Sequence, residues 1–170
     1  MRVVVTPTDT AGPGSGGVAY VGSWKDGAAD IVCWVFNQGI KSCADAIAHE
    51  VGHTLGLSHH GTTGKTYYAG HGGGLSVPTS WGPIMGAPYG VNLTQWSRGE
   101  YFGANNSAQD DLAIIASGNN FSYTISPGSF GVVQALPLNG NLFQVSGTLV
   151  SKDDSNVFQF TTTGGKVEAQ

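Results

Sequence analysis

Short apolar runs separated by glycine-rich turns make up the first part of the chain, a pattern typical of β-strands. Residues 2–6 contain a β-branched run that ends at Pro7, and residues 18–24 follow a glycine-rich turn. Residues 31–36, Ile-Val-Cys-Trp-Val-Phe, are apolar without interruption, and a run this short favours a buried strand over a helix. The pattern therefore predicts three strands in this part of the chain.

A helical period follows these strands. Five apolar residues fall at helical spacing: Ala44, Ile47, Ala48, Val51 and Leu55. Ser42 is predicted to cap the N-terminus of this helix. Gly56 is predicted to end it, because glycine adopts positive φ without steric cost.

The next segment, residues 61–90, has no periodicity and many Gly, Pro, Tyr and Thr residues, which predicts a long loop. Loops of this length in a compact domain are usually functional or disordered. A second helix is predicted at about residues 107–117. Asp110 and Asp111 are interpreted as acids of its first turn, where the helix dipole favours negative charge.

The last part of the chain predicts further strands, at residues 121–123, 142–150 and 157–163. We divide the chain into a first domain of residues 1–125, a linker of residues 126–137 and a last segment of residues 138–170. The last segment is too short to form a β-sandwich by itself.

Composition narrows the function classes. The chain has 7 Lys plus Arg against 11 Asp plus Glu, a net charge of −4, so the basic surface of a nucleic-acid-binding protein is absent. Charged residues make up 11% of the sequence and 27 of 170 residues are glycine, which indicates a loop-rich globular protein. No apolar stretch is long enough to predict a transmembrane helix, and the N-terminal apolar run is too short for a signal peptide. Cys33 and Cys43 could form one disulfide or remain buried thiols.

The candidate chemistry lies between residues 49 and 59. His49 and His53 are four residues apart on the predicted helix, so both imidazoles project from one face and can bind one metal ion. Neutral imidazole suits zinc, which usually takes three protein ligands and one water in catalytic sites. Gly56 lets the chain turn so that His59 returns to the metal as third ligand. Glu50, beside the first ligand, can reach a zinc-bound water without ligating the metal.

These residues resemble the extended zinc motif of the metzincin metallopeptidases, which matches His49, Glu50, His53, Gly56 and His59. The resemblance implies an α+β, zincin-like catalytic domain with a twisted mixed sheet, an active-site helix and a C-terminal helix. After this catalytic domain we expect a few strands of a second, all-β domain.

The resemblance also implies two structural features around the zinc. One is a tight turn with a methionine beneath the imidazoles, and residues 81–86, Trp-Gly-Pro-Ile-Met-Gly, supply Met85. The other is a strand before the helix that pairs with an extended substrate through backbone hydrogen bonds. The resemblance assigns this role to four residues: Gly17, Val18, Ala19 and Tyr20.

Within the metzincins, three stretches look like secreted, reprolysin-like (adamalysin-like) microbial enzymes: residues 93–101, 105–106 and 110–112. The strands after Leu138 look like the opening of a pre-peptidase C-terminal β-sandwich. Two positions depart from the reprolysin pattern: His60 replaces Asp, and Thr54 replaces Asn. His60 could compete with His59 as a ligand. Only 48 residues precede His49, so the first strands and helix of the usual sheet are expected to be missing, as in a chain truncated at its N-terminus.

Two further residues are weaker candidates. His71 could touch substrate. Tyr89 lies four residues past Met85, whereas the oxyanion-stabilising tyrosine of some metzincins lies closer, so Tyr89 receives no role.

The resemblance implies a zinc-dependent endopeptidase that hydrolyses peptide bonds by attack of a zinc-bound water, with Glu50 as general base and then acid. It implies one catalytic Zn²⁺ and leaves structural calcium open, although no loop of this sequence shows a calcium-binding pattern. We expect a secreted monomer that acts on protein or peptide substrates, without nucleic acid or membrane insertion. Two alternatives remain open: an inactive zinc- or peptide-binding metzincin remnant, and a structural β-rich fragment of a secreted protein.

Overall fold

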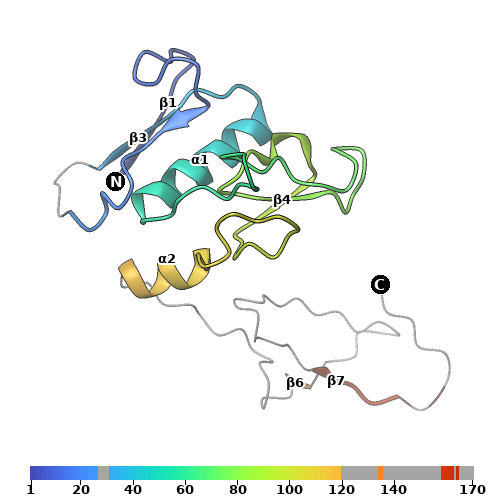
Figure 1. Ribbon diagram of the computed structural model, residues 1–170. Helices are drawn as coiled ribbons and strands as arrows, with labels where there is room; N and C mark the ends of the chain where they lie inside the picture. The colour runs from blue at the N-terminus through green and yellow to red at the C-terminus, as the bar shows by residue number, and fades with distance from the viewer. Residues whose placement is uncertain (27–30, 120–133, 136–157, 163, 165–170) are drawn as a thin grey trace. The chain divides into compact units, whose positions relative to one another are not determined.

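The computed structural model describes residues 1–26, 31–119, 134–135, 158–162 and 164 (Figure 1). The chain divides into two compact units, Met1–Phe121 and Ser122–Gln170. The predicted strands at 121–123 and 142–150 lie outside the described residues.

A three-stranded sheet begins the first unit. Its strands are β1 (Arg2–Val5), β3 (Val32–Val35) and β2 (Gly17–Val18), in the order β1-β3-β2. β1 runs parallel to β3, and β2 runs antiparallel to it. Cys33 and Val35 of the central strand are fully buried, as expected for a strand covered by a helix. The strands predicted at residues 2–6 and 31–36 are confirmed.

The predicted strand at residues 18–24 is wrong beyond Val18. The chain leaves the sheet there and turns, with Gly22 at φ 77°. The amide of Gly22 donates to the carbonyl of His53 at 2.8 Å, and the amide of Trp24 donates to the carbonyl of Thr54 at 3.0 Å. Carbonyls at a helix C-terminus have no partner within the helix. This segment therefore satisfies helix carbonyls instead of continuing the sheet.

Helix α1 (Ile40–Thr54) packs against β3 (Figure 1). The predicted N-cap is wrong: the cap residue is Gly39, without a side-chain hydrogen bond, and Ser42 lies inside the helix. The helix starts early because the amide of Cys43 already donates to the carbonyl of Gly39 at 2.9 Å. Its predicted end is confirmed, since Gly56 has φ 103°.

The predicted loop at residues 61–90 contains regular elements. Strand β4 (Trp81–Pro83) pairs in parallel with β5 (Leu93–Gln95), and a 3₁₀ turn, η1 (Pro88–Gly90), lies between them in sequence. Beside them a small core joins Leu57, Ile84 and Met85. Four partly buried residues pack on it: Ala48, Trp96, Ile114 and Ile115.

The second helix, α2 (Asp111–Asn119), begins later than predicted. Asp110 precedes it and accepts a hydrogen bond from the amide of Ala113 at 3.0 Å, so its interpretation as a helix-start acid is confirmed. Asp111 also lies in the first turn, as predicted, but it is fully buried and bonded to His60, 51 residues away in sequence.

In the second unit the described residues include one strand pair. β6 (Gln134–Ala135) runs parallel to β7 (Phe158–Gln159). β7 lies within the predicted strand at 157–163, whereas β6 lies within the segment predicted as a linker. The predicted domain boundaries stay a prediction.

Three further findings complete the description. No helix among the described residues is long and apolar enough to cross a membrane.

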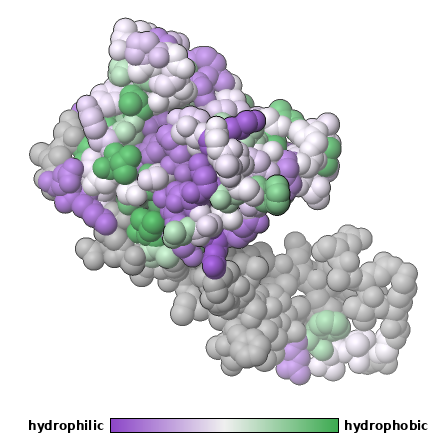
Figure 2. All heavy atoms as spheres, viewed as in Figure 1, coloured by the Kyte–Doolittle hydropathy of each residue, from purple (hydrophilic) through white to green (hydrophobic). Residues whose placement is uncertain are grey.

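Cys33 and Cys43 are both free thiols, so the disulfide alternative is not realised. On the viewed face of the first unit, hydrophobic residues form separate spots around a hydrophilic centre (Figure 2).

Candidate metal centre

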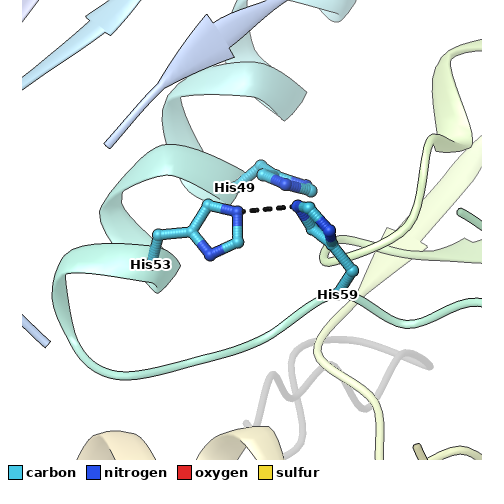
Figure 3. Close-up of side chains that lie close together, drawn as sticks. All are labelled: His49, His53 and His59. Carbon is cyan, nitrogen blue, oxygen red and sulfur yellow. Dashed lines mark hydrogen bonds between the residues drawn. The ribbon is translucent and has the colours of Figure 1, made fainter. Parts of the chain in front are cut away.

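Three histidines come together at one place in the first unit. His49 and His53 project from α1, and His59 reaches them from the irregular segment that follows Gly56 (Figure 3). One ring nitrogen from each lies within 4.8 Å of the others. His49 and His53 are buried and His59 is half-buried. The structure thus groups the three residues that the sequence predicted as ligands.

Backbone carbonyls set the orientation of the two helical rings. Nδ1 of His49 donates to the carbonyl of Ile84 at 2.8 Å, and Nδ1 of His53 donates to the carbonyl of Leu57 at 2.7 Å. A carbonyl oxygen only accepts, so the hydrogen of each neutral ring is on Nδ1 and the lone pair is on Nε2. This arrangement is the one that metal-binding histidines use.

Nε2 of His53 lies 3.0 Å from Nε2 of His59 (Figure 3). Because the lone pair of His53 is on this atom, His59 supplies the hydrogen between them. When the hydrogen of the neutral His59 ring is on Nδ1 instead, both Nε2 atoms offer lone pairs to a cation. The donor set of three imidazole nitrogens fits Zn²⁺.

All three imidazoles are held in the neutral form. Burial, followed by the charge of His53, lowers the pKa of His49 to about 4. Burial and then the charge of His53 also lower the pKa of His59 to about 4, and burial lowers the pKa of His53. Neutral rings are required for metal binding, so protons compete weakly with a metal here near pH 7.

Glu50 follows His49 on α1, and only 6% of it is exposed. Burial raises the pKa of its carboxyl to about 7. The backbone of β2 lies against this side chain: a Cβ on Gly17 would be 2.6 Å from Oε1 of Glu50 and 2.7 Å from the carbonyl oxygen of Trp34. A buried carboxyl with a pKa near 7 is suited to accepting and returning a proton at neutral pH.

Met85 is fully buried and lies against the helix between the two ligands on α1. A Cβ added to Gly52 would be 2.6 Å from its Sδ. The carbonyl of the preceding residue, Ile84, holds His49, and the carbonyl of Met85 accepts the amide of His60 at 2.8 Å. The turn at Met85 therefore contacts both the helix and the segment of the third ligand.

His60 is not part of the metal cluster. It is fully buried, and its Nε2 bonds to Oδ1 of Asp111 at 3.0 Å. The hypothesis that His60 replaces His59 as ligand therefore finds no support.

The predicted substrate-binding residues divide into two pairs. Gly17 and Val18 form β2, at the edge of the three-stranded sheet, whereas Ala19 and Tyr20 follow it outside the strand. Of the weaker candidates, His71 lies outside the metal cluster, and its Nδ1 contacts the hydroxyl of Tyr68 at 2.8 Å.

Tyr67 is a neighbour of the cluster that sequence reasoning missed. Its ring centroid lies 4.3 Å from that of His59 and 6.3 Å from that of His49, and 47% of the residue is exposed. Burial and the charge of Glu50 raise the pKa of its phenol. A tyrosine in an aperiodic loop carries no spacing signal, so only the folded chain places it here.

Comparison with known proteins gives one family. Residues 1–60 match the metallo-peptidase family M12B, reprolysin-like. The matched stretch contains the three-stranded sheet, α1 and all three histidines. No curated protein and no solved structure matches the chain significantly. The mixed α and β structure is compatible with a metallopeptidase fold, and the match over residues 1–60, together with the three-histidine cluster, supports a reprolysin-like zinc metallopeptidase.

Proposed function

We propose that the chain is a zinc-dependent endopeptidase of the metzincin type. The observation that carries the proposal is the convergence of three imidazole nitrogens within 4.8 Å, next to a buried carboxyl on the same helix. His49, His53 and His59 would hold one Zn²⁺. When bound, zinc supplies Lewis acidity, which lowers the pKa of a coordinated water and polarises a carbonyl group.

Glu50 performs the proton transfers. Its carboxylate accepts a proton from the attacking water, keeps it at a carboxyl oxygen and returns it to the amine that leaves when the peptide bond breaks. A carboxyl whose pKa is raised to about 7 by burial can do both at neutral pH. This raised pKa supports the role, because the carboxylate of an ordinary exposed glutamate, with its lower pKa, would accept the proton from water less readily.

The edge strand β2 binds the substrate. Its pairing to β3 leaves its outer edge without a partner strand among the described residues, so an extended peptide can add to it by backbone hydrogen bonds. The closeness of Gly17 to Glu50 supports this role, because a peptide added to β2 would then lie near the proton acceptor. Val18 continues the strand, and Ala19 and Tyr20 extend the contact beyond it.

Met85 supports the histidines from the core and takes no part in the chemistry. Its buried thioether packs against Gly52. The reprolysin likeness further favours an enzyme that is secreted and acts as a monomer on protein or peptide substrates.

The test is Glu50→Gln, which keeps the size of the side chain and removes its basicity. We expect kcat/KM on a quenched peptide library to fall at least about 100-fold, because general acid–base catalysis contributes that much or more. Zinc content should remain one per chain. Asp26→Asn, at an exposed position, is the matched control and should cleave like the unmodified protein.

Two outcomes would contradict the proposal. Equal cleavage by the Glu50→Gln protein would exclude Glu50 as the general base. A zinc-loaded, folded wild-type chain that cleaves no peptide would instead favour a zinc- or peptide-binding remnant.

A further inference from the structure

The third histidine lies in a stretch without regular secondary structure, Ser58–Gly61. No i→i+4 ladder of hydrogen bonds positions such a segment. Instead, each of its four residues forms a hydrogen bond, through its backbone or its side chain, with a side chain of one distant segment, Tyr101–Asp111. We call Tyr101–Asp111 the clamp segment.

Gln109 holds Ser58 by a pair of hydrogen bonds. The amide of Ser58 donates to Oε1 of Gln109 at 2.9 Å, and Nε2 of Gln109 donates to the carbonyl of Ser58 at 2.9 Å. Asn106 holds the next residue, since its Nδ2 donates to the carbonyl of His59 at 3.1 Å. The backbone is thus bound at the third ligand and immediately before it.

Asp111 holds the residue after the ligand. Its Oδ1 bonds to Nε2 of His60 at 3.0 Å, and both side chains are fully buried. The same oxygen accepts Nε2 of Gln109 at 2.8 Å, and Oδ2 accepts the amide of Ser97 at 3.0 Å. These bonds join His60 to Gln109, so the clamp acts as one network around the ligand.

Gly61 completes the set. Its amide donates to Oδ1 of Asn105 at 2.9 Å, and its carbonyl accepts the hydroxyl of Tyr101 at 2.7 Å. Three of the five clamp side chains, those of Tyr101, Gln109 and Asp111, belong to buried residues. Hydrogen-bonded buried polar groups favour one geometry, because leaving such a group unpaired is costly. Among the described residues, Nδ1 of His60 has no partner, so its bond to Asp111 through Nε2 is the side-chain bond that holds this ring.

We propose that the clamp segment is the positioning element of the third metal ligand, with Gln109, Asn106 and Asp111 as its positioning residues. The inference rests on the proposed role of His49, His53 and His59 as zinc ligands. Because the clamp orders the Ser58–Gly61 backbone on folding, zinc binding does not have to order it. Preorganisation of this kind strengthens binding.

Gln109→Glu tests the clamp with little change of shape. It keeps an oxygen for the amide of Ser58 but replaces the NH₂ group with an oxygen that faces two acceptors, the carbonyl of Ser58 and Oδ1 of Asp111. We expect the zinc dissociation constant, measured on the full chain by chelator competition, to rise about tenfold, the usual scale for the groups that support metal ligands. Asn106→Ala removes one bond from a partly exposed side chain and should give a smaller rise in the same direction.

Two controls separate positioning from general loss of stability. Asn92→Ala removes an exposed amide that bonds to Pro78, outside the clamp, and should leave the zinc dissociation constant unchanged. Ile31→Ala removes buried apolar volume at the residue before β3 and should lower the unfolding temperature without weakening zinc binding. Each constant is measured well below the unfolding temperature of its variant.

Unchanged zinc affinity in both Gln109→Glu and Asn106→Ala, with only a lowered unfolding temperature, would overturn the proposal. A wild-type chain that binds no zinc would overturn it as well. If only the proposed peptidase activity is wrong, the wild type would bind zinc without cleaving peptides. The zinc affinities of the wild type, the two clamp variants and the two controls would then still decide the role of the clamp.

Discussion

The candidate metal ligands come from two kinds of backbone, one helical and one irregular. The helix α1 supplies His49 and His53, whose separation follows from their spacing of four residues on one helix. An irregular segment supplies His59. The side chain of Asn106 bonds to the carbonyl of His59, and the side chain of Gln109 bonds to the amide and carbonyl of the preceding residue, Ser58. Regular backbone positions side chains by its own hydrogen bonds. Irregular backbone must be positioned by other parts of the protein.

The imidazole rings from the two kinds of backbone also differ in what they contact. His49 and His53 both donate Nδ1–H to backbone carbonyls, those of Ile84 and Leu57. The ring of His59 instead lies tilted beside that of Tyr67, with centroids 4.3 Å apart, and His59 is less buried than the two helical histidines. The third ligand is therefore the one that depends most on its neighbours.

The largest effect should come from removing ligands on each side of this comparison. His53→Ala and His59→Ala should each weaken zinc binding by at least about 100-fold, because a three-ligand site loses a third of its donors. The zinc dissociation constant, measured by chelator competition, checks this. His71→Ala, outside the cluster, should bind zinc like the wild type. Normal zinc binding by His59→Ala would mean that the helical pair suffices.

A smaller effect is expected from crowding the helical side. In Gly52→Ala the new Cβ would lie 2.6 Å from Sδ of Met85 and 3.1 Å from the ring of Trp96. Overpacking a buried contact of this kind costs about 1–3 kcal/mol in the free energy of unfolding, measurable by urea denaturation. Gly90→Ala is the matched control, since no atom lies within 4 Å of its new Cβ. Equal stability of the two variants would contradict the close packing of Met85 on α1.

The smallest effect concerns pH in the metal-free protein. The folded pKa of His49 and of His59 is about 4, below the ordinary value of 6.5, so the unfolded chain binds protons in this window and the folded chain does not. Stability should therefore fall as pH decreases from about 6.5 to 4. Glu50 acts in the opposite direction, because its folded pKa of about 7 contributes stability at low pH that is lost as pH rises. The imidazoles outnumber it and dominate.

Urea midpoints of the metal-free chain between pH 7 and 4.5 measure this dependence. Glu50→Gln should steepen the loss of stability, since it removes the opposing contribution. His49→Gln and His59→Gln should each reduce the loss by a similar amount, although one residue is helical and the other is not. A midpoint that stays constant in every variant would contradict the lowered pKa values.

Local sequence was enough to predict the elements whose geometry is local. The β-branched run of β1, the apolar run of β3 and the period of α1 are confirmed within one or two residues of their ends. The three histidines that meet in the structure follow from one short motif. Two of them are on the same helix, and Gly56 provides the positive φ that turns the chain toward the third.

Features that depend on distant partners could not be predicted in this way. The strand at Gly17–Val18 is short because the residues after it bond to the C-terminus of α1. Asp111 reads as an ordinary helix-start acid in the sequence, yet it is buried against His60, 51 residues away. Asn106 lies in the stretch that looks reprolysin-like, but nothing in the sequence pairs it or Gln109 with the segment of the third ligand. Their partners in the segment of the third ligand are backbone groups, which every residue possesses, so no pattern of side chains predicts the contact. Only folding brings the clamp segment to the third ligand.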